Sequence, residues 1–463
     1  MSTTALLAVQ GLIGVVVALW SRAVWGHSWR TVLVATLLFN ALPIATVPGY
    51  ASPLFLGDAL VPLALVALLV QGFPRPLWVL GIAFVALLGW PVIATTVAAG
   101  SGTGTIASLE GLYRRVGFVA FFALGLSLRF LPKVTVRGLL DTSSLLFAGM
   151  AWVALIQYFG GVDISGTEHT LQGGGVPTIF ESREAQRGFL GLNRGAVGVW
   201  AAVLGTYLGG RLMLTPRDQI TDSARLSLAL ALAGTLLAVL FSGSRTGMIA
   251  LGVGWTAVLV LVLRERRLRT WLRLTVIGGV VIGAGVLVAY PAADLLLSRF
   301  VMDVSDVTEV RSASSRWETQ LEIITLVSMD LRTATFGRGV GSTEFRQLVP
   351  TGLSHAHSEP LQQMWESGLP GVLFYIGFLG MVWIRVKRLG SDLNGPLAAL
   401  VQATLVAGSI AGLAVGFIAI TSPRLATFGY AMLFVYGRAC RSNVAVVRHT
   451  SAKFATDHFN PKP

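Results

Sequence analysis

The chain has 463 residues, of which 54% are hydrophobic and only 12% are charged, and its mean hydropathy is +0.71. This balance excludes an ordinary soluble protein and predicts an all-α, polytopic membrane protein. The net charge of +13 does not indicate a nucleic-acid partner, because the basic residues lie in short gaps between apolar runs, and the one cysteine excludes an internal disulfide.

Apolar runs long enough to cross a lipid bilayer follow one another along the chain. With about 20 apolar residues for each crossing, they predict a transmembrane helical bundle of about 12 to 13 spans. The runs are centred near residues 12, 39, 63, 87, 122, 149, 201, 234, 254, 283, 376, 408 and 430. A count of about 12 treats the first segment as re-entrant, and it changes the side on which the N-terminus lies.

The gaps between these runs alternate in charge. One set of gaps holds most of the basic residues and every lysine: SRAVWGHSWR, LRFLPKVTVR, RERRLRTWLR, RVKR and the C-terminal tail. By the positive-inside rule, this side faces the cytoplasm. Most carboxylates lie on the other side, in loops near residues 98–114, 160–188 and 294–364. We therefore expect a multi-pass protein of the cytoplasmic (inner) membrane with large extracytoplasmic loops.

The loop at 294–364 is expected to be structured. Within it, SSRWETQLEIITLV places apolar residues at nearly helical spacing, at Trp317, Leu321, Ile324 and Leu326. This pattern predicts an amphipathic helix that lies on the membrane or on the helical bundle. The glycine-rich stretch FGRGVGSTEF follows it and predicts a turn region.

The stretch SHAHSEPLQQMWESGLPG, at residues 354–371, introduces the next apolar run. Proline is tolerated in the first turn of a helix, so Pro360 places the helix start at Ser358 or Glu359. His357 then lies directly before the helix N-terminus, at the outer boundary of the membrane. A carboxylate in the first turn, such as Glu359, suits the helix dipole.

Two interpretations of the histidines in this stretch stay open on these residues alone. A helix N-terminus disfavours an imidazolium, so a neutral His357 is suited to act as a base near a phosphate. Alternatively, His355 and His357 only form hydrogen bonds with backbone or water where an interfacial helix begins. Glu366, one or two turns deeper in the helix, is costly to place there and is a second candidate for a functional role.

Arginines are placed at the outer ends of several predicted spans. The guanidinium group binds phosphate oxygens through two parallel hydrogen bonds. Arg245, in FSGSRTGM, lies between two apolar runs, where an unpaired cation is costly and requires a carboxylate or a bound phosphate. Further outer arginines are Arg194 in FLGLNRGAVG and, in the large loop, Arg311 and Arg316.

Metal sites are only weakly indicated. Asp303 and Asp306 could bring two carboxylates together, but no ligand set with diagnostic spacing is present in the sequence. Asp58 is a carboxylate inside the third predicted span, and the sequence indicates no partner for it. We therefore expect no metal and no other cofactor.

The sequence from His357 to Gly371 resembles the signature of the O-antigen ligase and O-antigen polymerase superfamily. That signature is His, then Asn, Ser or Gln, then nine residues and Gly-x-x-Gly, before a transmembrane helix and after a large extracytoplasmic loop. Here His357 and Ser358 are followed by nine residues and GLPG. FLGLNRGAVG, FSGSRTGM, the RxxxxRWE pattern that begins at Arg311, and GRGVGSTEF are also similar to the family.

The resemblance implies a fold like that of the C-type transmembrane glycosyltransferases, and a glycan donor carried on undecaprenyl diphosphate. It implies that His357 is the catalytic residue and that the diphosphate is held by Arg245 with Arg316 or Arg311. Secondary or acceptor-binding candidates are His355, Glu359, Asn193, Arg194 and Glu366. Ser358 stands where many members have Asn, so a role that requires the Asn amide does not carry over.

On this basis we divide the chain into three parts. Residues 1–180 form N-terminal transmembrane helices, residues 181–437 form the catalytic transmembrane region with the loop 294–364, and residues 438–463 form a cytoplasmic tail. The expected partners are the lipid-linked donor, a glycan or lipid acceptor and the bilayer, without nucleic acid. The sequence does not separate a ligase from a polymerase, and the alternative function is a multi-pass transporter or flippase of anionic lipid-linked substrates.

Overall fold

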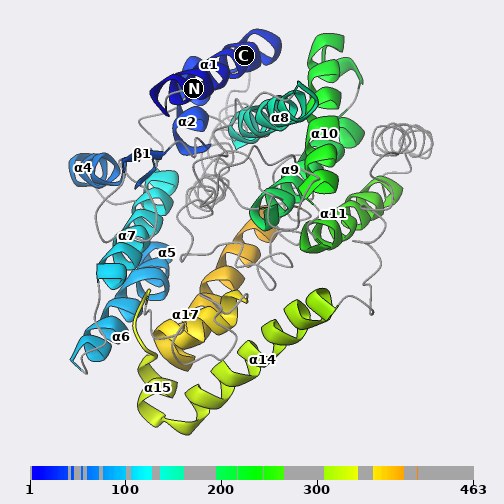
Figure 1. Ribbon diagram of the computed structural model, residues 1–463. Coiled ribbons are helices and arrows are strands. Elements are labelled where there is room, and N and C mark those ends of the chain that lie inside the picture. Colours follow the sequence, from blue (N-terminus) through cyan, green and yellow to red (C-terminus); the bar gives the residue numbers. More distant parts are fainter. Residues whose placement is uncertain are drawn as a thin grey trace, which may run out of the picture.

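The computed structural model describes residues 3–39, 43–45, 54–55, 60–71, 77–100, 106–127, 136–160, 194–215, 217–242, 245–264, 307–341, 358–389 and residue 404. This part of the chain is nearly all helical, as predicted (Figure 1). It contains five helical segments long and apolar enough to cross a membrane: Leu77–Ala99, Val197–Leu214, Asp222–Val239, Thr246–Leu263 and Glu359–Ile384. The prediction of a polytopic helical membrane protein is therefore confirmed.

The total number of spans stays a prediction. The predicted spans centred near residues 283, 408 and 430 lie outside the described residues, apart from residue 404. Asp58, Asp303 and Asp306 also lie outside them.

The N-terminal helices are α1 to α8. In chain order they are α1 (Thr3–Trp25), α2 (Trp29–Phe39), α4 (Val61–Gln71), α5 (Leu77–Phe84), a π-helical turn η1 (Val85–Gly89), α6 (Trp90–Ala99), α7 (Ile106–Ser127) and α8 (Val136–Gly160). Segments α5, η1 and α6 follow one another without a gap. Helix α7 begins well inside the stretch 98–114 that was expected to form an outer loop, so the arginines near residue 114 belong to a helix.

The predicted span centred near residue 39 is wrong as a continuous helix. Helix α2 ends at Phe39 after 11 residues, about half the length needed for one crossing. The short strand β1 (Pro43–Ala45) follows and pairs antiparallel with β2 (Leu54–Phe55). Proline lacks a backbone N–H and clashes with the preceding helical turn, so Pro43 is incompatible with continuing the helix.

The second half contains the remaining described helices. They are α9 (Arg194–Leu214), α10 (Asp222–Ser242), α11 (Arg245–Arg264), α14 (Val307–Met329), α15 (Leu331–Phe336) and α17 (Glu359–Leu389), with a short 3-10 turn at Arg217–Gln219. Of the five candidate spans, the one in α9 is the most enclosed, since 94% of the residues from Val197 to Leu214 are buried. Helix α9 packs on both α10 and α11. Figure 1 shows α9 beside α10 and α11.

Glycines allow α9 and α11 to pack closely in a parallel orientation. A Cβ atom on Gly247 of α11 would lie 2.6 Å from the backbone of Gly198 in α9. Further along, Gly209 of α9 faces the ring of Trp255, so the contact continues in the same direction along both helices. Small residues permit this approach in membrane proteins, where close packing replaces the hydrophobic driving force between helices. The first residues of α9 and α11 are consequently brought to neighbouring positions.

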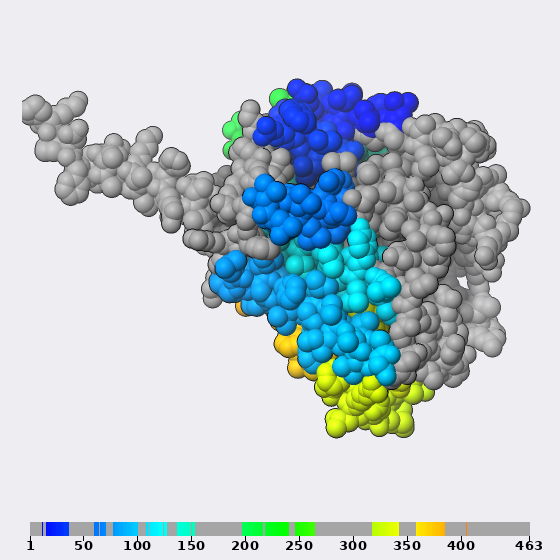
Figure 2. All heavy atoms as spheres, turned by 90° about the vertical axis from the view of Figure 1, so that its left-hand side faces the viewer, coloured from blue at the N-terminus to red at the C-terminus, as the bar shows by residue number. Residues whose placement is uncertain are grey.

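The predicted amphipathic helix is present as α14, but its buried face differs from the predicted stripe. Ile323 and Val327 are buried and pack around Trp365 of α17. Trp317 is 63% exposed, and Leu321 and Ile324 are also exposed. The helix therefore contacts the bundle through a face to which Leu326 of the predicted stripe contributes, and it leaves Trp317, Leu321 and Ile324 exposed. In Figure 2, the described part of α14 and α15 (yellow-green) forms the lower end of the visible face.

Candidate functional site

The site is built around the start of α17. This helix begins at Glu359, within the predicted start at Ser358 or Glu359, and the N–H of Gln362 donates to the carbonyl oxygen of Ser358 at 2.9 Å. His357 therefore directly precedes the described helix start in the chain. His355, His357 and Asn193 lie outside the described residues, as do the side chains of Arg194, Arg245, Arg311 and Arg316.

A buried ion pair joins α17 to α7. Arg115 Nη2 lies 2.7 Å from Glu366 Oε2, and both side chains have no exposed surface. The same Nη2 atom donates to Gln363 Oε1 at 3.1 Å. A buried carboxylate needs such a partner, because desolvation of an unpaired charge costs several kcal/mol. The predicted interest of Glu366 thus has a structural explanation in Arg115, a residue that was not singled out from the sequence.

The hydrogen bonds continue from this pair to the first turn of α17. Gln362 Nε2 donates to Glu366 Oε1 at 2.8 Å, and Gln363 Nε2 donates to Glu359 Oε1 at 2.8 Å. Each bond joins residues four apart, the spacing that brings side chains together on one helix face. Glu359, only 2% exposed, has no hydrogen-bond partner for its Oε2 atom in the described part of the chain. The turns that follow His357 are consequently held from the interior of the protein.

The GLPG sequence forms a break in α17 that was not predicted from the sequence. Gly368 has a φ of 69° and a ψ of −175°, so the helix is divided there, with Pro370 at the start of its second part. A Cβ atom at position 368 would collide with the carbonyl group of Thr335 at the end of α15. The part from Leu369 to Leu389 still amounts to about 31 Å of helix, enough for a bilayer core of about 30 Å. The first segment therefore extends beyond the length that a single crossing needs.

The backbone groups freed by this break find partners in the segment that follows α15. The N–H groups of Arg338 and Gly339 donate to the carbonyls of Trp365 and Glu366, at 2.7 and 3.1 Å. The indole of Trp90 in α6 donates to the Ser367 carbonyl at 2.7 Å. Buried backbone groups are costly when unpaired, so these bonds stabilise the break. Figure 1 shows α15 beside the first segment of α17.

Helix α15 is itself fixed to α6. Asp330 caps its N-terminus by accepting hydrogen bonds from the backbone N–H groups of Arg332 and Thr333, both at 3.1 Å. The side-chain hydrogen bond from Thr333 is the main cause that lowers the pKa of Asp330 below its ordinary value of 3.8. Arg332 Nη2 donates to the carbonyl of Val97 at 2.6 Å, and the N–H of Val340 donates to Thr95. The large loop thus has a defined attachment to the membrane helices.

The helices carrying the predicted arginines can be placed by their backbones. Arg194 is the first residue of α9 and Arg245 is the first residue of α11. The close approach of Gly198 and Gly247 puts these two helix starts side by side. Helix N-termini favour anions, because their first N–H groups lack backbone partners. Arg311 and Arg316 both lie on α14.

Residues 229–376 match the family described as O-antigen ligase. The match begins within α10 and ends within α17, so it includes His357, the GLPG break, Arg245 and both candidate arginines of α14. No match was found among curated proteins. The matched region contains most of the segments that suggested the resemblance, with FLGLNRGAVG lying before it, and the match supports a place in the O-antigen ligase and polymerase superfamily.

Proposed function

We propose that this protein, an O-antigen ligase-type membrane glycosyltransferase, transfers a glycan from undecaprenyl diphosphate to an acceptor hydroxyl at the extracytoplasmic face of the inner membrane. The observation that supports the proposal is the start of α17 at Glu359, two residues after His357 in the sequence and inside the region that matches the family. A neutral imidazole is favoured there, because the helix dipole opposes its protonation.

In the proposed reaction, His357 removes the proton from the acceptor hydroxyl. The acceptor oxygen attacks the anomeric carbon of the donor sugar, the bond from that carbon to the diphosphate oxygen breaks, and the configuration at the carbon is inverted. Undecaprenyl diphosphate leaves with the bonding electron pair. General-base assistance of this kind contributes about 10² to 10⁴ in rate.

Negative charge accumulates on the leaving diphosphate, and arginines are suited to stabilise it. Arg245 begins α11 beside the start of α9, so two helix N-termini and their dipoles are available to the same anion. Arg316 or Arg311 on α14 would contribute the second guanidinium, and Arg194 a further one. Because these groups supply the stabilisation that a metal ion gives elsewhere, the proposed reaction is independent of metal.

The buried network beneath α17 has a positioning role in this proposal. Arg115, Glu366, Gln363 and Glu359 connect α7 to the turns that follow His357 through bonds of 2.7 to 3.1 Å. A base must be held within hydrogen-bond reach of the proton that it removes, so a fixed helix start favours catalysis. His355 and Asn193 remain candidates for binding the acceptor.

The break in α17 does not favour the alternative function as a transporter or flippase. Transporters use broken helices near the bilayer midplane, where unpaired backbone groups contact the substrate. Here the break lies nine residues after the helix start, and the backbone N–H groups of Arg338 and Gly339 and the Trp90 indole occupy the carbonyls beside it. This arrangement favours a structural junction over a transport path.

A reconstituted transfer assay tests the proposal. The purified protein would receive an undecaprenyl-diphosphate-linked glycan and either a lipid A core acceptor or a second lipid-linked glycan. We expect His357→Ala to lower the transfer rate by about 10² to 10⁴, while His355→Ala keeps most of the activity. Wild-type activity is expected to persist in EDTA.

Other outcomes of the same assay would contradict the proposal. A wild-type rate for His357→Ala, with an inactive His355→Ala, would refute the assignment of the base. Loss of activity in EDTA that returns with a divalent cation would contradict a metal-independent reaction and direct attention to Asp303 and Asp306. Product with only one of the two acceptors distinguishes a ligase from a polymerase.

A further inference from the structure

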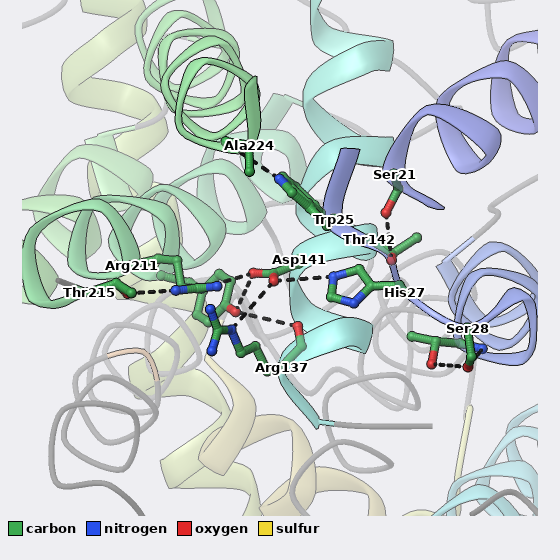
Figure 3. A network of polar contacts seen from close by, with 12 residues as sticks. Ser21, Trp25, His27, Ser28, Arg137, Asp141, Thr142, Arg211, Thr215 and Ala224 are labelled. Carbon is green, nitrogen blue, oxygen red and sulfur yellow. Dashed lines mark hydrogen bonds and ion pairs between the residues drawn. The ribbon is translucent and has the colours of Figure 1, made fainter. Parts of the chain in front are cut away.

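A second polar cluster lies away from the candidate site, where the ends of α1, α8 and α9 meet (Figure 3). At its centre is Asp141 of α8, which is 1% exposed. Tyr207 donates its hydroxyl to Asp141 Oδ1 at 2.6 Å, and Arg211 Nε lies 3.4 Å from the same oxygen. His27 Nε2 and Arg137 Nε lie 3.3 and 3.9 Å from Asp141 Oδ2. One carboxylate is thus approached by two arginines and a histidine.

A cavity of about 350 Å³ lies next to this cluster. It is lined by the turn between α1 and α2 and by the adjoining helix ends, with Arg22, Gly26, His27, Ser28, Trp29 and Arg30. The turn is well defined: Gly26 has a φ of 64° and its N–H donates to the Arg22 carbonyl, and Ser28 Oγ accepts from the N–H of Thr31. The cavity is therefore a formed feature of the connection between two helices.

The charge around the cavity is not balanced. Neither Arg22 nor Arg30 has an ion-pair partner among the described residues, and Asp141 already faces Arg137 and Arg211. The described residues that line the cavity or contact Asp141 include four arginines, and Asp141 itself is the acidic residue in this group. Cations gathered in this way attract an anion, and an arginine pair is well suited to a phosphate group.

The surroundings of the cavity indicate how that phosphate is presented. Helix α1 leads to the cavity with a row of exposed apolar side chains at Val15, Val16 and Leu19. Trp29, which lines the cavity, is 57% exposed, and tryptophan is enriched at the level of lipid headgroups. A volume of about 350 Å³ is at the lower end for ligand sites, which suits a small headgroup.

We propose that this cavity binds the phosphate of an anionic phospholipid, whose acyl chains lie along the exposed face of α1. Arg22 and Arg30 contact the phosphate, and His27 is held beside them by Asp141. The sequence SRAVWGHSWR belongs to the side predicted to face the cytoplasm, so the lipid belongs to the inner leaflet. This binding site is separate from the proposed transferase reaction and does not depend on it.

A lipid titration followed by native mass spectrometry tests this proposal on the full-length protein in nonionic detergent. Phosphatidylglycerol and phosphatidylcholine serve as anionic and neutral lipids. We expect phosphatidylglycerol to bind at least about ten-fold more tightly, because each basic residue near a lipid headgroup contributes about five-fold. The variant R22Q/R30Q is expected to lose this preference, and the single variants R22Q and R30Q to lose about five-fold each.

The matched control is R225Q, which removes one arginine from the start of α10 without changing the lining of the cavity. It is expected to keep the preference for phosphatidylglycerol. Equal binding of the two lipids by the wild type, or an unchanged preference in R22Q/R30Q and both single variants, would overturn the proposal. So would displacement of phosphatidylglycerol by an equal concentration of glycerol 3-phosphate, because the ligand would then be a soluble phosphate.

Discussion

Glu366 and Asp141, two of the buried carboxylates in the described part of the chain, are both paired with arginine, yet their surroundings differ. Glu366 and Arg115 have no exposed surface, and the network around them holds one arginine and two carboxylates. Asp141 is shared among Arg137, Arg211 and His27, and Arg137 is 40% exposed. The first network is enclosed between helices, whereas the second opens toward a cavity with further arginines.

This difference separates two uses of buried charge. An enclosed pair fixes the relative positions of two helices, because neither partner can turn to water if the other is removed. An open cluster with excess positive charge retains the ability to bind an added anion. In this protein the enclosed pair involves the first turns of α17, which follow the proposed catalytic His357 in the sequence, and the open cluster lies where α1 meets α8 and α9 (Figure 3).

The largest expected effect tests the enclosed pair. Glu366→Ala leaves Arg115 buried without its carboxylate and is expected to lower the free energy of unfolding by about 3 to 5 kcal/mol. Asp141→Asn should cost less, because Arg137 can turn to water and Tyr207 keeps an acceptor. Chemical denaturation in detergent, followed by tryptophan fluorescence, measures both changes.

The variant R115M/E366L is the control for this prediction, since it removes both charges and keeps apolar volume. It should recover much of the stability lost in Glu366→Ala, as replacement of a buried ion pair by apolar residues is often nearly neutral. If Asp141→Asn proved more destabilising than Glu366→Ala, the distinction between an enclosed and an open network would fail.

The start of α17 was predictable because its signals are local. Pro360 in the first turn and the distance from His357 to the GLPG sequence lie within a single stretch, and the helix begins where they indicate. The partner of Glu366 was not predictable in this way. Arg115 is 251 residues distant in sequence, and a single sequence gives no information on which helices become neighbours.

A single sequence also left one buried helix face unidentified and led to one error in the fold. Both faces of α14 carry apolar residues, so periodicity predicted the helix and the stripe with Trp317 and Ile324, but it did not identify the second face with Ile323, which is buried against the bundle. Near residue 39, hydropathy remained high through a segment that contains Pro43, and the chain forms a short strand pair there instead of one span. Hydropathy reports burial or lipid contact without specifying the conformation.

A second prediction concerns the junction that supports the enclosed network. Gly368→Ala should lower the free energy of unfolding by at least about 1 to 3 kcal/mol, because alanine is strained at a φ of 69° and its Cβ would meet the Thr335 carbonyl. Gly377→Ala in the same helix is the matched control. A Cβ atom at position 377 would meet no neighbouring element within 4 Å in the described part of the chain, so this variant should be neutral or slightly stabilising.

The transfer assay extends this comparison to function. Gly368→Ala should reduce transfer at a temperature where the variant remains folded, since the turns after His357 would lose their support, whereas Gly377→Ala should transfer at the wild-type rate. Equal stability and activity of the two variants would show that the break at GLPG has no role in holding the start of α17.

The smallest expected effect concerns Asp330, a carboxylate at the surface near the enclosed network. Its pKa is lowered below 3.8, chiefly by the Thr333 hydroxyl, so its charge adds stability that is present above that pH and is lost as the pH falls through the lowered pKa. Asn also caps helices, so Asp330→Asn removes the charge and keeps the cap. The difference in Tm between wild type and Asp330→Asn should therefore be constant near neutral pH and shrink below pH 3.8.

Asp330→Ala removes the cap together with the charge, so it should be less stable than Asp330→Asn at every pH. A difference between wild type and Asp330→Asn that grows as the pH falls would contradict the assigned direction of the pKa. We expect only a small change in stability in these variants, because in Asp330→Ala water can replace Asp330 as the partner of the backbone N–H groups. Burial, more than the number of hydrogen bonds that a carboxylate accepts, then explains why Glu366 should be far more sensitive to substitution than Asp330.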